Sequence, residues 1–263
     1  MVDFPVMSNS SLLTFPTSAE TARQFARNFP TYAEAARVQK RAADALVDLL
    51  AETSGQTRFS AATELGCGTG LLTRSLTRRF AIGKLALFDL AANCPDYLRD
   101  VAYDSFTVAD LDELQSLPTT ELVVSASCLQ WIKHPLRLFR TIHAALHPGG
   151  LFAASTFSEG NLNEIALCGG TPLPCPSVAT WGRLLEESGF AVRRLVAETS
   201  TLHFPSALEA LRHLKRTGVL IPTMRDYRQT RRFLARYETL RRDGTIPLTY
   251  APVRWIAEKP RGI

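Results

Sequence analysis

The N-terminal part of the chain carries apolar residues at helical spacing between residues 19 and 54. The recurring positions are Val38, Ala42, Ala45, Leu46, Leu49 and Leu50. Positions three or four apart lie on one face of a helix, so this stretch predicts amphipathic helices. Pro30 interrupts the pattern, because proline lacks a backbone donor and crowds the preceding turn. We therefore expect two helices, 19–28 and 33–52, with Gly55 ending the second.

Short apolar runs separated by helical stretches follow. Strands are predicted at 59–65, 84–88, 106–108, 122–125 and 151–156. Helices are predicted at 71–79 and 136–145, and the second is stopped by His147-Pro148-Gly149-Gly150. Strands that alternate with helices in this way indicate an α/β fold with a parallel, doubly wound, Rossmann-like sheet.

The alternation loosens after residue 157. The expected elements are a Pro- and Gly-rich loop at 168–176, a helix at 178–188, a strand at 191–202, helices at 205–217 and 223–242, and a strand at 249–257. The length of 263 residues suits one α/β domain with a small insertion. We assign that domain to 19–263 and treat 1–18 as a flexible arm.

Composition excludes several classes of protein. No apolar run approaches the roughly 18–20 residues that a membrane-spanning helix needs, and the N-terminus lacks a basic-then-apolar secretory pattern. The five cysteines form no C-x-x-C pair and have no zinc-site spacing. We expect reduced thiols in a cytoplasmic protein, with no metal site and no contact with a membrane.

The net charge of +5 is unevenly distributed. Ten Lys and Arg residues lie between Leu211 and Arg242, against only Asp226 and Glu238. Such a segment attracts an acidic partner, either nucleic acid or an acidic carrier protein. A solvated helix face explains the same pattern equally well.

A glycine-rich loop follows the first predicted strand, with the sequence Glu64-Leu65-Gly66-Cys67-Gly68-Thr69-Gly70. Glycine lets a ligand approach the main chain, and the next helix offers free N–H groups. The pattern is not the G-x-G-x-x-G of dinucleotide sites. A carboxylate before the first glycine repels a pyrophosphate but attracts the cationic amino-acid end of S-adenosylmethionine (SAM). We therefore expect SAM here, bound by Glu64, Gly66, Cys67, Gly68 and Gly70.

Acidic residues end the next two predicted strands. Asp89 is placed to accept hydrogen bonds from both ribose hydroxyls, with Leu90 beside it. Asp110 is placed to accept from the adenine amino group, and Leu111 to pack on the ring. The alternative for each aspartate is a helix cap or turn residue.

These segments resemble class I SAM-dependent methyltransferases. Flanking motifs between about residues 24 and 259 are similar to those of the malonyl-[acyl-carrier protein] O-methyltransferases of biotin synthesis. The matching segments are Phe25-Ala26-Arg27, Tyr32, Val38-Gln39, Ser125-Ala126-Ser127-Cys128-Leu129-Gln130-Trp131, Ser155-Thr156-Phe157, Leu211-Arg212-His213-Leu214-Lys215-Arg216-Thr217-Gly218 and Pro247-Leu248-Thr249-Tyr250. The chain departs from the family at Leu90-Ala91-Ala92-Asn93, at Glu121 and at Ala126.

The resemblance implies a mostly parallel sheet with an antiparallel C-terminal strand. It also implies a helical lid at 19–54, a helical cap inserted at about 203–245, and further cofactor contacts from Gln39 and Ser127. The implied reaction is methylation of the free carboxylate of malonyl-acyl carrier protein, and the acidic carrier would bind the basic segment. The resemblance argues against nucleic acid as a partner.

A malonyl carboxylate is ionised at neutral pH, with a reference pKa of about 4, so it needs positioning rather than a general base. We expect Tyr32 to donate a hydrogen bond, Arg212 to grip the carboxylate and Lys215 to assist. Gln130 and Trp131 are expected to wall the acceptor pocket. Structural roles remain open for all five. Also open are another acceptor (a small acid, a quinone or tRNA) and a SAM-binding protein without catalysis.

Overall fold

The computed structural model describes residues 17–218 and 227–262. Most of the expected N-terminal arm, residues 1–16, lies outside the described residues, as does the 223–226 part of the predicted helix 223–242. Within the described ranges, no helix is long and apolar enough to cross a membrane.

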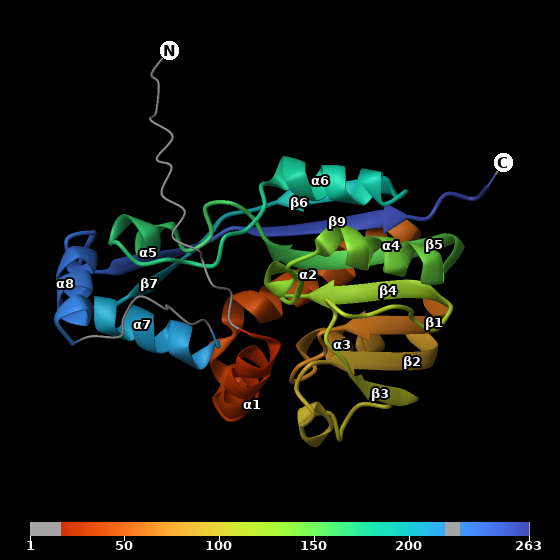
Figure 1. The fold of residues 1–263 in the computed structure, drawn as a ribbon, viewed down its shortest axis with the longest axis horizontal. Coiled ribbons are helices and arrows are strands. Elements are labelled where there is room, and N and C mark those ends of the chain that lie inside the picture. The colour runs from red at the N-terminus through yellow and green to blue at the C-terminus, as the bar shows by residue number, and fades with distance from the viewer. Residues whose placement is uncertain (1–16, 219–226, 263) are drawn as a thin grey trace, which may run out of the picture.

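A seven-stranded sheet forms the centre of the molecule (Figure 1). Its strands in spatial order are β3 (Ser105–Val108), β2 (Ala81–Asp89), β1 (Arg58–Leu65), β4 (Thr120–Ala126), β5 (Leu146–Phe157), β9 (Pro252–Glu258) and β6 (Ala191–Ala197). The first five strands pair in parallel, whereas β9 is antiparallel to both of its neighbours. The predicted fold class is confirmed, including the antiparallel C-terminal strand.

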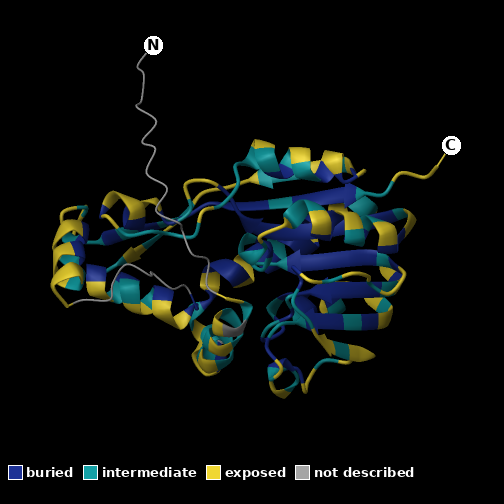
Figure 2. Cartoon of the chain, in the orientation of Figure 1, coloured by how far each residue is buried: buried dark blue, intermediate teal, exposed yellow. Residues whose placement is uncertain are grey.

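Two layers of helices cover the sheet, one on each face. The helices are α2 (Arg37–Ser54) and α3 (Leu71–Arg79) on one face, and α4 (Pro135–Ala145) and α6 (Val178–Glu187) on the other. Side chains alternate between the faces: Leu122 and Val124 of β4 join the apolar cluster with α2, and Val123 joins the cluster with α4. Figure 2 shows the result, with buried strands between helices whose outer faces are exposed.

A third apolar cluster lies beside the main sheet, and we refer to its elements as the cap. They are α5 (Asn163–Leu167), β7 (Ser200–Phe204), α7 (Ala207–Arg216), α8 (Tyr227–Glu238) and β8 (Ile246–Tyr250), at the left of Figure 1. β7 and β8 pair with each other to form a separate two-stranded sheet.

The single strands predicted at 191–202 and 249–257 are therefore wrong. In each case the chain changes pairing partner, from β6 to β7 and from β8 to β9. The local signals at the two changes are weak: the polar run Glu198-Thr199-Ser200-Thr201 at the first and Pro252 at the second, with no glycine at either. The short helix α5 was not predicted at all.

The first helix, α1 (Ser18–Ala35), runs through Pro30, so the predicted break there is wrong. The helix ends instead at Ala36, where the backbone adopts φ −79° and ψ 46°. Proline deprives the carbonyl of Ala26 of its usual partner. The side-chain amide of Asn93 lies 3.5 Å from that oxygen and donates to it, which compensates for the lost bond.

The buried face of α2 provides a stability test. Leu46 is 1% exposed in the first apolar cluster, and Asp48 lies two residues away on the exposed face. We expect Leu46→Ala to lower the free energy of unfolding by about 2–5 kcal/mol, because it leaves a cavity. Asp48→Ala should change it by no more than about 0.5 kcal/mol. Denaturant unfolding measures the free energy of unfolding of both variants. Equal losses in the two variants would contradict this packing.

Candidate active site

A cavity opens at the carboxyl ends of the parallel strands, where doubly wound sheets bind ligands. Its empty volume is about 1080 Å³, open solvent at its mouth included. Phe25, Phe29 and Tyr32 of α1 contribute to its wall. The predicted cofactor residues that line it are Gln39, Glu64, Gly66, Cys67, Gly68, Asp89, Leu90, Asp110, Leu111 and Ser127. We call this space the cofactor cavity.

The glycine loop needs its glycines for two different reasons. Gly66, Gly68 and Gly70 all have positive φ, at 76°, 50° and 81°. A Cβ on Gly66 would overlap the side chain of Cys128, so the turn tolerates no larger residue. Gly70 does not line the cavity. It caps α3, and a Cβ there would overlap Leu98, so it serves close packing rather than ligand contact.

Glu64 carries a buried carboxyl group whose burial is little offset by its surroundings. The residue is 1% exposed, and neither of its carboxylate oxygens has a hydrogen-bond partner in the described part of the chain. Burial raises the pKa of Glu64 to about 8. The nearby Thr73 lowers this pKa but only partly offsets the effect of burial. A cation placed in the cavity would remove this cost. The ammonium group of SAM would meet that need, and its contact with Glu64 stays a prediction.

Asp89 is held rigidly at the end of β2. One carboxylate oxygen accepts a hydrogen bond from Gly68 N and the other from Ala91 N, both at 2.8 Å. Burial nevertheless raises the pKa of Asp89. Each oxygen can accept a second hydrogen bond, so the carboxylate suits a pair of ribose hydroxyls. Asp110 accepts a hydrogen bond from Asp112 N at 3.0 Å, as expected of a turn residue, and it also lines the cavity. Its contact with adenine stays a prediction.

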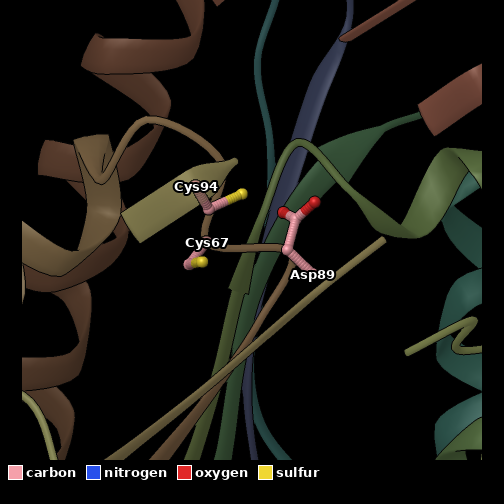
Figure 3. Close-up of side chains that lie close together, drawn as sticks. All are labelled: Cys67, Asp89 and Cys94. Atoms are coloured by element: carbon pink, nitrogen blue, oxygen red, sulfur yellow. The ribbon is translucent and has the colours of Figure 1, made fainter. Parts of the chain in front are cut away.

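Cys67, Asp89 and Cys94 lie together beside this cavity (Figure 3). Their ligand atoms are all within 4.8 Å of one another, a grouping that could hold a metal ion. The hydrogen bond with Cys94, then burial, raises the pKa of the Cys67 thiol, whereas metal binding requires a thiolate. Since Cys67 and Asp89 line the cofactor cavity, we assign the group to its wall. The absence of a metal site stays a prediction.

A second cavity adjoins the first and has an empty volume of about 470 Å³. The residues common to both are Phe25, Tyr32, Gln39, Ser127 and Trp131, and they mark the junction. The rest of the lining is Gln130, Phe157, Asn161, Leu162, Leu173, Cys175, Thr217 and Tyr250. In the described part of the chain this lining contains no charged side chain. We call it the acceptor cavity.

Two tyrosines offer hydroxyl groups there. Burial raises the pKa of Tyr32 above its usual range, so the phenol keeps its proton and can donate it to a hydrogen bond. Tyr250 was not assigned a role from the sequence, although it ends the quoted Pro247–Tyr250 motif. Its hydroxyl lies 2.9 Å from Nε2 of His213. Burial lowers the pKa of His213 to about 4, so this imidazole is neutral at pH 7.

Gln130 and Trp131 occupy different places. Trp131 lines both cavities and packs edge-on against Phe25 of α1, with ring centroids 5.4 Å apart. Gln130 lines only the acceptor cavity. Its amide is already occupied: Nε2 donates to the carbonyl of Ser127 at 2.7 Å, and Oε1 accepts from Thr156 at 2.9 Å.

The structure does not bring Arg212 or Lys215 to either cavity. Both lie on the exposed side of α7, and Arg212 forms an ion pair with Glu209 one turn earlier in the helix. The expected carboxylate grip by Arg212 fails because residues 207, 210 and 214 form the buried face of α7. Its helical position directs Arg212 away from that face.

The strand order, the glycine turn and the uncompensated Glu64 together define a class I SAM-dependent methyltransferase. A family model described as "Methyltransferase domain" matches residues 35–195. Malonyl-[acyl-carrier protein] O-methyltransferase of Porphyromonas gingivalis is 34% identical over 90% of this chain and 94% of its own length. The protein of the same name from Chlorobium phaeovibrioides is 33% identical over 88% and 92%. The chain belongs to this family.

Solved structures agree on the fold. The [4+2]-cyclase SpnF superposes with a TM-score of 0.63, covering 94% of this chain and 97% of its own, at 18% identity. The N-methyltransferase NodS of Bradyrhizobium japonicum, in complex with S-adenosylhomocysteine (SAH), gives a TM-score of 0.54, covering 91% and 98%, at 12% identity.

Glu64→Gln tests the buried charge. The pKa of Glu64 in the folded protein, about 8, lies above its ordinary value of 4.5. The folded state therefore holds the extra proton between these limits, and the stability of the ligand-free protein falls as pH rises from about 4.5 to about 8. Glu64→Gln should flatten this fall, so its melting temperature should exceed that of the wild type at pH 8 more than at pH 5.

The same variant should bind SAH at least about tenfold more weakly, because it loses a charge-assisted contact. Glu159→Gln makes the same chemical change at an exposed position and serves as the control. Thermal melts at both pH values and calorimetric titration with SAH measure the two effects. Unchanged SAH affinity in Glu64→Gln would contradict the assignment of this carboxylate to the cofactor.

Proposed function

We propose that the protein transfers the methyl group of SAM to the free carboxylate of malonyl-acyl carrier protein and forms its methyl ester. The observation that carries the proposal is the uncharged acceptor cavity, which adjoins the cofactor cavity and offers the neutral donor Tyr32. The relatives named malonyl-[acyl-carrier protein] O-methyltransferase support the choice of substrate. The family resemblance places this step early in biotin synthesis, where the ester hides a charge from chain-elongating enzymes.

The residues of the chain position and desolvate the acceptor. A malonyl carboxylate is already ionised, so no base is required. The Tyr32 phenol donates to one carboxylate oxygen, which leaves the other free at the junction. Phe25 and Trp131 pack together over the junction and exclude water. When bound, SAM supplies an electrophilic sulfonium methyl.

An uncharged lining suits this reaction better than a cationic one. The carboxylate and the sulfonium both lose their charge as the methyl moves, so charge decreases toward the transition state. A fixed Arg or Lys would stabilise the ionised acceptor more than the transition state and would slow the step. Neutral hydrogen-bond donors hold the carboxylate with a smaller penalty of this kind. The exclusion of Arg212 from the cavity therefore agrees with the chemistry.

The basic segment supplies a surface for the carrier protein. Exposed cations on α7 and α8 include Arg212, Lys215, Arg216, Arg231 and Arg232. Leu208 and Tyr227 are large apolar side chains exposed on the same two helices. Thr217, which directly follows α7, lines the acceptor cavity. A carrier bound to α7 would thus lie close to the cavity that receives its acyl group.

All five cysteines are free thiols. Free thiols persist in a reducing compartment, and two of them lie in the core of the cofactor half of the molecule. We infer that the protein acts in the cytoplasm, where acyl carrier protein is available to it.

The reaction itself can be observed by mass spectrometry. Purified protein, SAM and malonyl-acyl carrier protein should give a carrier whose mass has increased by one methylene. The reaction should proceed under single-turnover conditions, because both cavities belong to one chain. Acetyl-acyl carrier protein, which lacks the free carboxylate, is the matched control. No gain of mass with the malonyl carrier would refute the proposed acceptor while leaving the methyltransferase fold intact.

Charge reversal tests the docking surface. The pair Lys215→Glu and Arg216→Glu should raise KM for malonyl-acyl carrier protein about tenfold or more at low salt. KM for malonyl-pantetheine, which lacks the acidic protein, should stay unchanged, as should SAH affinity. Arg183→Glu, an exposed substitution on α6, is the control. Equal KM values for the carrier in the variant and the wild type would exclude this surface.

A further inference from the structure

Ser127 has an unusual backbone. It directly follows β4 and has φ of 54°, in the left-handed region that favours glycine. A serine in this conformation is strained, and such strain persists only where the surroundings enforce it. Glycine would adopt the same turn freely, so the serine side chain itself needs an explanation.

Three hydrogen bonds enforce the conformation. Ser127 N donates to the carbonyl of Ser155 at 2.8 Å. The Ser127 carbonyl accepts from Nε2 of Gln130 at 2.7 Å. Oε1 of Gln130 in turn accepts from the Thr156 hydroxyl at 2.9 Å, which fixes the amide to β5. Gln130 therefore acts as a brace between β5 and the Ser127 carbonyl, with both ends of its amide in use.

The Ser127 hydroxyl lies where the two cavities meet. Ser127 lines both cavities, and its Oγ is buried without a hydrogen-bond partner in the described part of the chain. A buried hydroxyl without a partner is costly unless a ligand completes it. At this junction the sulfonium methyl of the cofactor meets the acceptor carboxylate. Of these two groups, only the carboxylate can accept a hydrogen bond from a hydroxyl.

We propose that the Ser127 hydroxyl donates to the acceptor carboxylate, and that Gln130 is the positioning residue that holds Ser127 in its left-handed conformation. This inference rests on the proposed function. It changes two sequence-based expectations, since Ser127 moves from the cofactor to the acceptor and Gln130 acts through Ser127 instead of touching substrate. Tyr32 and Ser127, which line both cavities, then provide two neutral donors for one carboxylate.

A double-mutant cycle separates the two roles. Ser127→Ala should lower kcat/KM for malonyl-acyl carrier protein about tenfold or more, because it removes a hydrogen bond to a charged group. SAH affinity should change by less than about twofold, because the Ser127 hydroxyl makes no hydrogen bond to the cofactor. Gln130→Ala should also lower kcat/KM in the wild-type background. In the Ser127→Gly background it should cause no further loss, because glycine needs no brace and has no hydroxyl to position.

A second variant covers the case in which Gln130→Ala fails to fold. Thr156→Val keeps the side-chain shape and removes the hydroxyl that donates to Gln130. It should reduce kcat/KM in the wild-type background and have no effect in the Ser127→Gly background. A purely structural role for Gln130 or Thr156 predicts equal losses in both backgrounds and would overturn the proposed brace.

The remaining outcomes are also decisive. Unchanged kcat/KM in Ser127→Ala, or a loss of SAH affinity that matches the loss of activity, would overturn the acceptor contact. If the wild-type protein forms no methyl ester, the proposed function fails first. If the wild type is active and only the cycle shows no coupling, the brace alone fails.

Discussion

The buried carboxylate of Glu64 is the constraint around which the cofactor half of the molecule is arranged. It lies near the end of β1, between β2 and β4, and is 1% exposed. Burial raises its pKa to about 8, and a cation bound in the cavity would offset the cost of ionising it. The glycine turn that follows keeps side chains away, so Glu64 faces the cavity. Stability and cofactor binding are therefore linked through one residue.

The acceptor half depends on a different feature: the chain twice passes from a strand of one sheet directly to a strand of the other. β6 leads into β7 and β8 leads into β9, so the cap is joined to the main sheet by strands rather than by a loose linker. The helix α1 closes the arrangement, since Gln24 donates to the carbonyl of Gly218 at 2.8 Å just beyond α7. The acceptor cavity lies where these parts meet, which explains why its lining comes from segments far apart in sequence.

Sequence patterns predicted those features that are local. The parallel strands, the glycine turn and the acidic residues at strand ends depend on short stretches, and the structure brings Glu64, Asp89 and Asp110 to one cavity. The effect of Pro30 was mispredicted because Asn93, from a distant loop, supplies the missing hydrogen bond. The changes of sheet at 198–199 and 251 were missed because the pairing partners are set by strands distant in sequence, and only a polar run and Pro252 mark the changes locally.

The acceptor residues were harder to predict for a related reason. A motif shows that a residue matters but not which way its side chain points. Arg212 and Tyr250 both belong to recognisable segments, yet the helix turns the first outward while the strand turns the second inward. The partners of Gln130 lie directly after β4 and on β5, so its role depended on how two strands pair.

The position of α1 couples the walls of the two cavities. Phe25 and Tyr32 belong to this one helix and line both cavities. A shift of α1 would therefore alter the walls of both cavities together, so the shape of one is coupled to the shape of the other through this helix.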